Sequence, residues 1–351
     1  MASCRVSAAI TLLCLCLFSN IFWYMIIKQR MLPSPTPQSK SSTSVLCKGC
    51  RKGIDDMLKR YSKRWEKNEE NYRKFTSKLS DSCRGFERAI VTQANTPVGT
   101  KLAYDGEINR MLRVTPDIFK TFIKEHPFSK KAFNTCAVVG NGAILTDSGC
   151  GKMIDSARYV IRCNLPPLTD EYSEDVGVRT DLVTANPSIF VKRYNSLFGR
   201  RRDLMERLQS YGKSPILVPA FSFISNTQVA LRLANILEDL DSPSRAIFFN
   251  PDYLNNLSRF WAAKGLKTHR LSTGFMMASL ALELCSNVHL YGFWPFSKPP
   301  HGLHALPYHY YDDPKPVRWW YHAMPAEFDL LLKLHSLGVL RLHLGRCPPV
   351  E

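Results

Sequence analysis

The chain has 351 residues, of which 45% are hydrophobic and 22% are charged, and we find no internal repeat in it. Its 47 Lys and Arg exceed its 30 Asp and Glu, and the resulting net charge of +17 favours anionic ligands. In the densely charged segment Lys48–Arg88 the aromatic residues do not alternate with basic ones as they do where bases stack, so we do not expect nucleic acid as a partner. Eleven cysteines are more than a cytosolic domain needs, and they indicate an oxidising compartment.

The chain begins with a predicted membrane anchor. Val6–Ile27 is uncharged and almost wholly apolar, and Lys28 and Arg30 follow it directly. At ~1.5 Å per residue this segment spans about 33 Å, which is enough to cross a bilayer. A cleaved signal peptide would be shorter and would end in a small-residue cleavage site, which is absent here. The flanking charges do not decide the orientation. Because the short tail is easily retained, we expect residues 1–5 in the cytoplasm, a single-pass type II anchor over residues 6–27, and a luminal remainder.

Two segments separate this anchor from the main body of the chain. Pro33–Ser44 is rich in Pro, Ser, Thr and Gln and is typical of an extended linker. Lys48–Arg88 is dense in charges of both signs and predicts a solvated helical stem. We therefore assign residues 28–94 to linker and stem, and residues 95–351 to one globular domain.

The most informative part of the globular domain is a strand, turn, helix and strand pattern between Cys136 and Pro167. An apolar strand precedes the Asn141-Gly142 turn, and we expect a helix over Asp155–Tyr159 and a strand over Val160–Cys163. Further elements follow in alternation, with strands over Asp181–Ala185, Ile216–Pro219 and Ala246–Phe249 and a helix over Val229–Leu240. This order predicts an α/β fold with a doubly wound, mostly parallel sheet, whose carboxyl edge is the usual place for a nucleotide.

A second block, Leu271–Phe296, combines a capped helix with a strand. Ser272, Thr273 and Gly274 precede an uninterrupted helical run, Phe275–Leu284, so the bare N–H groups of its first turn could hold a phosphate. From the spacing alone, an ordinary capped core helix is the more common explanation. The following strand, Val288–Tyr291, leads to Trp294, which could cover a base or sugar or simply pack on the core.

Four histidines then fall within 22 residues. They are His301, His304, His309 and His322, and the same segment is rich in prolines. Their spacing matches no compact zinc signature, so acid, base or phosphate-binding roles are favoured over a metal site.

These blocks together resemble the animal sialyltransferases. Cys136–Asn164, with CAVVGNG, GCGK and RCNLPP, is similar to the large sialylmotif, and Leu271–Phe296, with LSTG and YGFWPF, is similar to the small one. His309-Tyr310-Tyr311-Asp312 resembles the third motif, and His322 with Glu327 resembles the very small one. The strings VTANPSI, HYYD and YGFWPF look like the α2,8 subfamily, and others lean toward its mono- and oligosialylating members, closest to the fifth and sixth subtypes.

The resemblance implies a Rossmann-like glycosyltransferase, a GT-A-like variant, in the Golgi membrane. It implies transfer of sialic acid from CMP-sialic acid to the 8-hydroxyl of a terminal sialic acid, with inversion and without a metal or other cofactor. The acceptor would be a sialylated glycoprotein or glycolipid, including the acceptors of ganglioside biosynthesis, and a homodimer is allowed. An inactive sialoglycan-binding homologue and a sialyltransferase of different linkage are the alternatives.

The resemblance also implies roles for individual residues. His322 would be the general base, and His309 would contact the donor phosphate. The remaining donor-binding residues would be Asn141, Asn164, Ser272, Thr273, Gly274 and Trp294. For Glu327, orienting a loop, binding and capping a helix all remain open.

The cysteines of the subfamily imply two disulfides, Cys136–Cys285 and Cys150–Cys347, and a buried free thiol at Cys163. Pairing among the stem cysteines Cys47, Cys50 and Cys83 stays open. Asn256-Leu257-Ser258 is the only N-glycosylation sequon we find. The acceptor class and product length cannot be deduced from the sequence, although Lys120–Lys131 holds only scattered charges, which disfavours polysialylation.

Overall fold

The computed structural model describes residues 48–61, 64–128, 133–300, 302, 304–312 and 322–348, with the side chains of 48–51 left out. Most of these residues belong to one compact unit, Lys52–Glu351. The predicted anchor and linker lie outside the described residues. Among the described helices, none combines the length and the apolar composition needed to cross a membrane.

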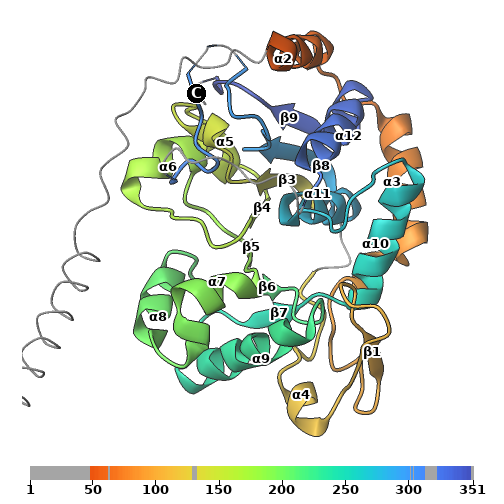
Figure 1. Ribbon diagram of the computed structural model, residues 1–351, viewed down its shortest axis with the longest axis vertical. Coiled ribbons are helices and arrows are strands. Elements are labelled where there is room, and N and C mark those ends of the chain that lie inside the picture. Colours follow the sequence, from red (N-terminus) through yellow and green to blue (C-terminus); the bar gives the residue numbers. More distant parts are fainter. Residues whose placement is uncertain are drawn as a thin grey trace, which may run out of the picture. The chain divides into compact units, whose positions relative to one another are not determined.

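A seven-stranded sheet forms the centre of this unit (Figure 1), in the order β7-β6-β5-β4-β3-β8-β9. Every neighbouring pair is parallel. The chain winds outward from β3 to β7 and then returns to the other side of β3, which creates a topological switch point there. The strands are β3 (Phe133–Val139), β4 (Tyr159–Arg162), β5 (Leu182–Thr184), β6 (Ile216–Val218), β7 (Ala246–Phe248), β8 (Cys285–Tyr291) and β9 (Arg341–His343). This confirms the predicted α/β class and the predicted strands.

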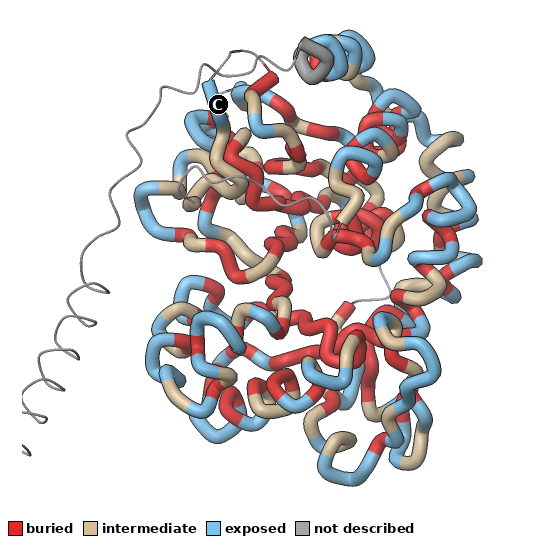
Figure 2. The backbone as a smooth tube through the Cα atoms, in the orientation of Figure 1, coloured by how far each residue is buried: buried red, intermediate tan, exposed pale blue. Residues whose placement is uncertain are grey.

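Helices cover both faces of the sheet. They are α5 (Gly151–Asp155), α6 (Asp170–Val176), α7 (Pro187–Arg193), α8 (Arg201–Gln209), α9 (Ile224–Asp239), α10 (Pro251–Ala263), α11 (Thr273–Leu284) and α12 (Met324–Ser336). Alternate residues of β3 face opposite cores, since Cys136 and Val138 pack with α10, α11 and α12, whereas Ala137 and Val139 pack with α5, α7 and α9. The strands β5, β6 and β7 are wholly buried and are drawn red in Figure 2.

Two smaller parts complete the described fold. The helices α2 (Lys48–Tyr61) and α3 (Glu69–Cys83) precede the sheet, and the short strands β1 (Lys101–Ala103) and β2 (Met111–Arg113) form an antiparallel hairpin before α4 (Pro116–Lys120). The predicted solvated stem is wrong for α3, because Leu79 and Cys83 are fully buried against the main body. One apolar stripe within a highly charged segment is sufficient to dock it. The domain boundary at residue 95 stays a prediction.

The helix predicted over Asp155–Tyr159 is also wrong. The structure has α5 earlier, at Gly151–Asp155, and Tyr159 already belongs to β4. A Cβ on Gly151 would lie 2.1 Å from the carbonyl oxygen of Ser173, so α5 packs against the α6 backbone where only glycine fits. This contact between distant segments fixes the position of the helix.

Candidate active site

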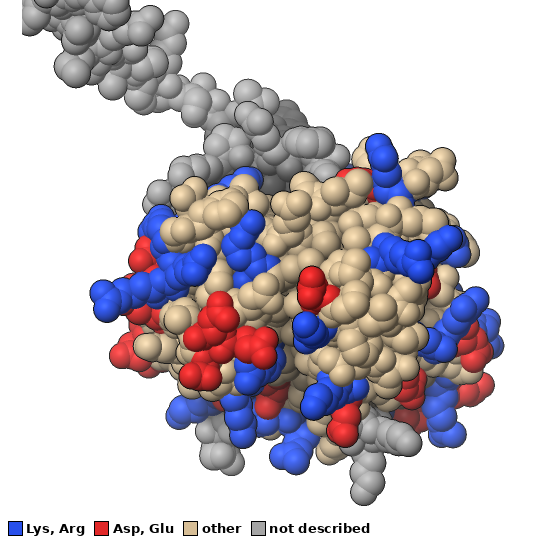
Figure 3. Space-filling model, turned by 90° about the horizontal axis from the view of Figure 1, so that it is seen from below, with Lys and Arg blue, Asp and Glu red and all other residues tan. Residues whose placement is uncertain are grey.

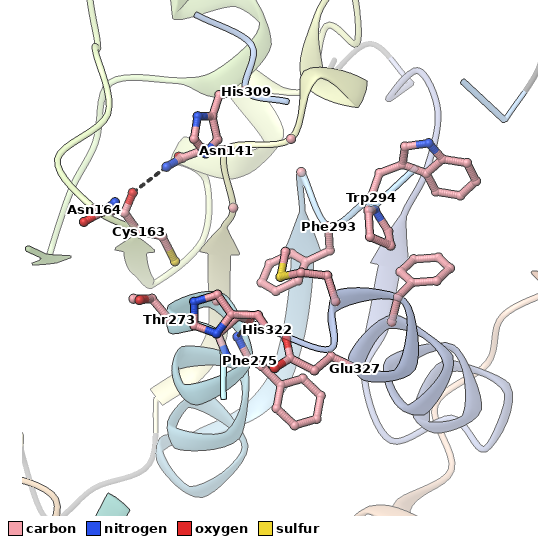
Figure 4. Close-up of a pocket in the computed structure, with 18 of the residues that line it drawn as sticks. Asn141, Cys163, Asn164, Thr273, Phe275, Phe293, Trp294, His309, His322 and Glu327 are labelled. Atoms are coloured by element: carbon pink, nitrogen blue, oxygen red, sulfur yellow. Dashed lines mark hydrogen bonds between the residues drawn. The ribbon is translucent and has the colours of Figure 1, made fainter. Parts of the chain in front are cut away.

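The carboxyl ends of four adjacent strands surround a cavity of about 160 Å³ (Figure 4). The segments that follow β3, β4, β5 and β8 contribute residues, and α11 and α12 close the other side. The lining includes the predicted residues Asn141, Asn164, Ser272, Thr273, Gly274, Trp294, His309 and His322. The structure thus brings every predicted catalytic and donor-binding residue to one cavity at the switch point.

Glycines allow the ends of β3 and β8 to approach each other beneath this cavity. A Cβ on Gly140 or Gly142 would lie 2.8 or 2.6 Å from the carbonyl oxygen of Gly292, which itself has a φ of +71°. The Gly142 N–H donates to that same carbonyl at 3.0 Å. Larger residues would separate the two strand ends and widen the cavity floor.

Asn141 holds the segment His309–Asp312 against this floor. Its backbone carbonyl accepts from the N–H of Tyr310 at 3.0 Å, and its side-chain Nδ2 donates to the carbonyl of Cys163 at 2.7 Å. The other side-chain atom, Oδ1, is buried and accepts no hydrogen bond from the described residues. A hydroxyl or amine of a bound nucleotide would satisfy this acceptor.

Asn164, Asn186 and Thr273 form a polar chain across the cavity. The Asn164 Oδ1 accepts from the backbone N–H of Asn186 at 3.0 Å, and the Thr273 hydroxyl donates to Asn186 Oδ1 at 3.2 Å. Asn164 is in the left-handed region, with a φ of 69°. The sequence reasoning missed Asn186 as a site residue, although, like Asn141 and Asn164, it follows an apolar strand at the sheet edge.

Ser272 caps α11 and connects it to α12. Its hydroxyl accepts from the N–H of Phe275 at 3.2 Å, and its own N–H donates to Glu327 Oε1 at 2.8 Å. The backbone N–H groups of Thr273 and Gly274 begin the helix and have no helical carbonyl to bond. The carboxylate of Glu327 thus fixes the start of α11, which supports a positioning role, and Glu327 also lines the cavity, so its contact with a ligand stays a prediction.

Burial raises the pKa of Glu327 to about 7, and the hydrogen bonds from Ser272 oppose this rise. In the unfolded chain the Glu327 carboxyl titrates near its ordinary pKa of 4.5. Ionisation of Glu327 therefore lowers the free energy of unfolding as the pH rises from 4.5 to about 7. We expect Glu327→Gln, which keeps an oxygen acceptor for Ser272, to be more stable than the wild type at pH ~8, by up to the order of 3 kcal/mol. The two proteins should converge below about pH 4. Thermal unfolding of both without donor, across this pH range, measures the difference, and a pH-independent gap would contradict the assignment.

His309 lies on the opposite side of the cavity, in the segment that docks on Asn141. Its Nδ1 is 2.5 Å from Asp312 Oδ2, and its ring stacks on Tyr311 at 5.0 Å. Burial lowers the pKa of His309, whereas the negative charge and hydrogen bond of Asp312 raise it. Since Nδ1 faces a carboxylate, Nε2 is the nitrogen available to a ligand, and a bound phosphate would favour the doubly protonated ring.

The tautomer of His322 is set by a backbone carbonyl. Its Nδ1 lies 3.0 Å from the carbonyl oxygen of Arg270, which can only accept, so Nδ1 carries the proton. Burial lowers the pKa of His322 below its ordinary value of 6.5, and the hydrogen bond to Arg270 partly opposes this. In the neutral ring Nε2 is therefore the nitrogen that can accept a proton, as a general base requires.

Two aromatic residues line the side formed by the β8 loop. Trp294 is only 7% exposed, its Nε1 donates to the carbonyl of Lys298 at 2.7 Å, and it meets Phe328 edge-on. It is thus largely a core residue with one surface on the cavity, and its contact with the donor stays a prediction. Phe293, which was not predicted as a site residue, also lines the cavity. Its ring packs closely on Gly274, where an added Cβ would lie 3.0 Å from the ring.

A second cavity, of about 260 Å³, adjoins the first. Both cavities are lined by Asn186, Thr273 and His322, and the second extends along Pro187, Phe223 and Arg270. His322 therefore lies at the boundary between two binding spaces, as a base that joins two substrates would.

The structure contains both disulfides expected from the resemblance. Cys136–Cys285 joins β3 to the junction of α11 and β8, and Cys150–Cys347 joins the start of α5 to the carboxyl-terminal segment. Cys163 is a buried free thiol, and burial raises its pKa to about 12. Cys83 is also free and buried, whereas Cys47 and the side chain of Cys50 lie outside the described part.

Two further predictions concern glycosylation and metal. Asn256 lies within α10, not on a loop, and its Oδ1 accepts from Arg259 at 3.3 Å, so its glycosylation stays a prediction. Within the described ranges, no group of three His, Cys, Asp or Glu residues is arranged to hold a metal ion.

Comparisons with known proteins show the family of this chain. The chain is 45% identical over 284 residues to human alpha-2,8-sialyltransferase 8E, covering 81% of this chain and 75% of that protein. It is 42% identical over 283 residues to human alpha-2,8-sialyltransferase 8F, covering 81% and 71%. A solved mammalian sialyltransferase in complex with Gal-beta-1-3GalNAc-ortho-nitrophenol aligns at 19% identity and a TM-score of 0.45, over 81% of this chain and 89% of that one. Residues 90–339 match the family of the sialyltransferases, and the chain belongs to it, glycosyltransferase family 29.

Proposed function

We propose that this sialyltransferase moves sialic acid from CMP-sialic acid to the 8-hydroxyl of a terminal sialic acid on a glycan. The linkage is supported by its similarity to proteins named alpha-2,8-sialyltransferases over most of its length. The first cavity takes the donor, and the adjoining cavity takes the acceptor. Inversion at the anomeric carbon follows if the acceptor attacks from the side opposite the phosphate.

The observation that carries this mechanism is the neutral imidazole of His322 at the boundary of the two cavities. Its Nε2 takes the proton from the acceptor hydroxyl while that oxygen bonds to the anomeric carbon. The bond from this carbon to the phosphate oxygen breaks, and CMP leaves with the electron pair. His309 and the N–H groups at the start of α11 meet the growing charge on the phosphate, so the leaving group is stabilised electrostatically.

The chemistry assigned to the chain's own residues needs neither a metal ion nor another cofactor. The proton moves to His322 and the phosphate charge is met by His309 and the start of α11. We infer that the donor is the only nucleotide required.

The cellular setting follows from the sequence and the cysteines. We propose a single-pass type II protein of the Golgi membrane, with residues 95–351 as its luminal catalytic domain. The two disulfides support an oxidising lumen, because such bonds rarely persist in a reducing cytosol.

Incubating the chain from residue 45 onward with CMP-sialic acid and sialylated acceptors tests this function. Linkage analysis of the product should find the new sialic acid on the 8-hydroxyl of the old one. A product of another linkage would reassign the acceptor hydroxyl. Absence of transfer by a folded, donor-binding protein would instead support the inactive glycan-binding homologue.

A further inference from the structure

The backbone of Arg270 holds the proposed base. Its carbonyl oxygen lies 3.0 Å from His322 Nδ1 and also accepts from the Thr268 hydroxyl at 2.9 Å. The contact with Nδ1 decides which ring nitrogen of His322 carries the proton, so the position of this one carbonyl sets the tautomer. Two residues later, Ser272 begins α11. A displaced Arg270 would therefore disturb the base directly.

The side chain of Arg270 is fixed to a segment that lies far away in the sequence. Its guanidinium donates to Asp105 Oδ2 at 2.7 Å and to the Ser222 hydroxyl at 2.6 Å. Asp105 lies 165 residues earlier, in the turn between β1 and β2. Only 14% of the Arg270 side chain and 7% of the Asp105 side chain are exposed. The two residues thus form an internal ion pair between two loops.

This ion pair differs from those on the surface of the protein. Figure 3 shows Lys and Arg side chains beside Asp and Glu at several places on one face, where solvent screens their attraction. The pair of Arg200 and Asp203, with side chains 61% and 46% exposed, is also of this exposed kind. For a buried pair, the cost of removing two charges from water offsets their attraction. Stability alone is therefore a weak explanation for the Asp105–Arg270 pair.

The carboxylate of Asp105 is only partly satisfied. Its second oxygen, Oδ1, is buried and accepts no hydrogen bond from the described residues. A buried acceptor without a donor costs free energy, and such groups persist where their geometry serves a function. The position of Asp105 thus indicates a role beyond holding the fold together.

The hairpin gives Asp105 a fixed support. The N–H of the next residue, Gly106, donates to the carbonyl of Ser222 at 2.9 Å. A Cβ on Gly106 would lie 2.6 Å from the Phe223 ring, so only glycine allows this close approach. Because the hairpin is packed this tightly, the ion pair restrains Arg270 at a defined place.

We propose that Asp105 is a positioning residue for the transfer reaction: it holds the guanidinium of Arg270, and Arg270 in turn holds His322 in the tautomer and orientation of a base. Asp105 does not line the donor cavity, so it acts through Arg270. This inference rests on the proposed function of His322. It gives the β1–β2 hairpin a part in catalysis, although no sialylmotif includes that hairpin.

The same pair sets the charge near the base. Burial lowers the pKa of His322, and the positive charge of Arg270 lowers it further. The Asp105 carboxylate compensates part of that charge, because it lies 2.7 Å from the guanidinium. Loss of the Asp105 charge should therefore lower the pKa of His322, whereas loss of the Arg270 side chain should raise it. Other charged or titratable groups around the adjoining cavities are Glu327 on α12, His309 across the first cavity and His269 before α11.

The rate of transfer tests the positioning itself. With the full-length chain, CMP-sialic acid and sialyllactose, Asp105→Ala should lower kcat by about ten- to a hundredfold, because the base is displaced, and leave the KM for the donor nearly unchanged. Asp105→Asn keeps an oxygen acceptor for Arg270 and should recover most of kcat. Steady-state kinetics measures both quantities, and an alanine variant with the kcat of the wild type would overturn the proposal.

The pH profile separates this role from a structural one. It is measured as kcat/KM for the acceptor at saturating donor, in a Glu327→Gln background, so that titration of Glu327 does not enter. The rising limb should move to lower pH by roughly half a unit or more in Asp105→Asn, and to higher pH by a similar amount in Arg270→Met. A purely structural defect lowers the rate without moving the limb in opposite directions.

Asp155→Asn is the matched control. It also removes a carboxylate that faces a buried guanidinium, that of Arg162 at 3.6 Å, but Asp155 lies on α5 and lines none of the cavities described here. Its limb should coincide with that of the background protein. Limbs of the Asp105 and Arg270 variants that do not move, or that move in the same direction, would overturn the proposal. A background protein without a rising limb, or a wild type without transfer, would instead refute the proposed function.

Discussion

Replacing His322 with alanine is expected to lower transfer by roughly 10²–10⁴-fold while donor binding survives. The imidazole is the only group that the mechanism uses to take the acceptor proton, and general-base catalysis typically contributes a factor of this size. In the proposed mechanism the donor, in contrast, is held mainly by the strand ends around Asn141 and by the start of α11. Steady-state kinetics measures the rate of transfer, and calorimetric titration with CMP-sialic acid measures the affinity for the donor.

Two comparisons make this result specific. His304→Ala removes an exposed histidine from the same part of the chain and should leave both quantities at wild-type values, because His304 does not line the cavity. His322→Gln can still donate to the Arg270 carbonyl but cannot accept a proton at working pH, so it should be as inactive as the alanine variant. Turnover of either His322 variant within about tenfold of the wild type would show that His322 is not the base.

Removing the Cys136–Cys285 disulfide should have a large effect on folding. The two cysteines are 149 residues apart, and a bridge over such a distance restricts the unfolded chain by about 5 kcal/mol in the chain-entropy model. Measured losses for native disulfides are about 2–5 kcal/mol, which is a large share of the stability of a typical domain. The double variant Cys136→Ala/Cys285→Ala should therefore be secreted poorly and melt well below the wild type.

Cys83→Ala is the matched control for this prediction. It also removes a fully buried sulfur atom, but that cysteine is free, so only a small packing defect is expected. Thermal unfolding of the secreted proteins separates the loss of a covalent link from the loss of a buried atom. If the double variant melted at the same temperature as Cys83→Ala, the disulfide would contribute little to stability.

Much of this site could be predicted from local sequence signals. Asn141 and Asn164 follow apolar strands, and parallel strands bring such positions to one edge of the sheet. Ser272 precedes an uninterrupted apolar helix, so its capping role follows from the pattern. These signals depend on a few neighbouring residues, and the structure confirms the positions that they predict.

Contacts between distant segments could not be predicted in the same way. Glu327 accepts from Ser272, 55 residues earlier, and nothing near Glu327 in the sequence indicates this partner. The β1 and β2 strands are three residues each, too short for a clear alternation, so their hairpin and the cavity of about 800 Å³ between it and Arg270 were not expected. Both the positioning of α11 and the shape of this cavity depend on how such segments pack.

The pH dependence of kcat/KM for the acceptor, at saturating donor, tests the role of His322 most directly. Saturation keeps His309 in its donor-bound state, and the same profile measured on Glu327→Gln removes the other cavity group with a pKa near neutrality, so that His322 is the group left to titrate. Because burial lowers the pKa of His322, the neutral ring should predominate near neutrality. The account predicts that kcat/KM rises from about pH 5 and levels off near about pH 7. A value that stays constant or falls over that range would contradict it.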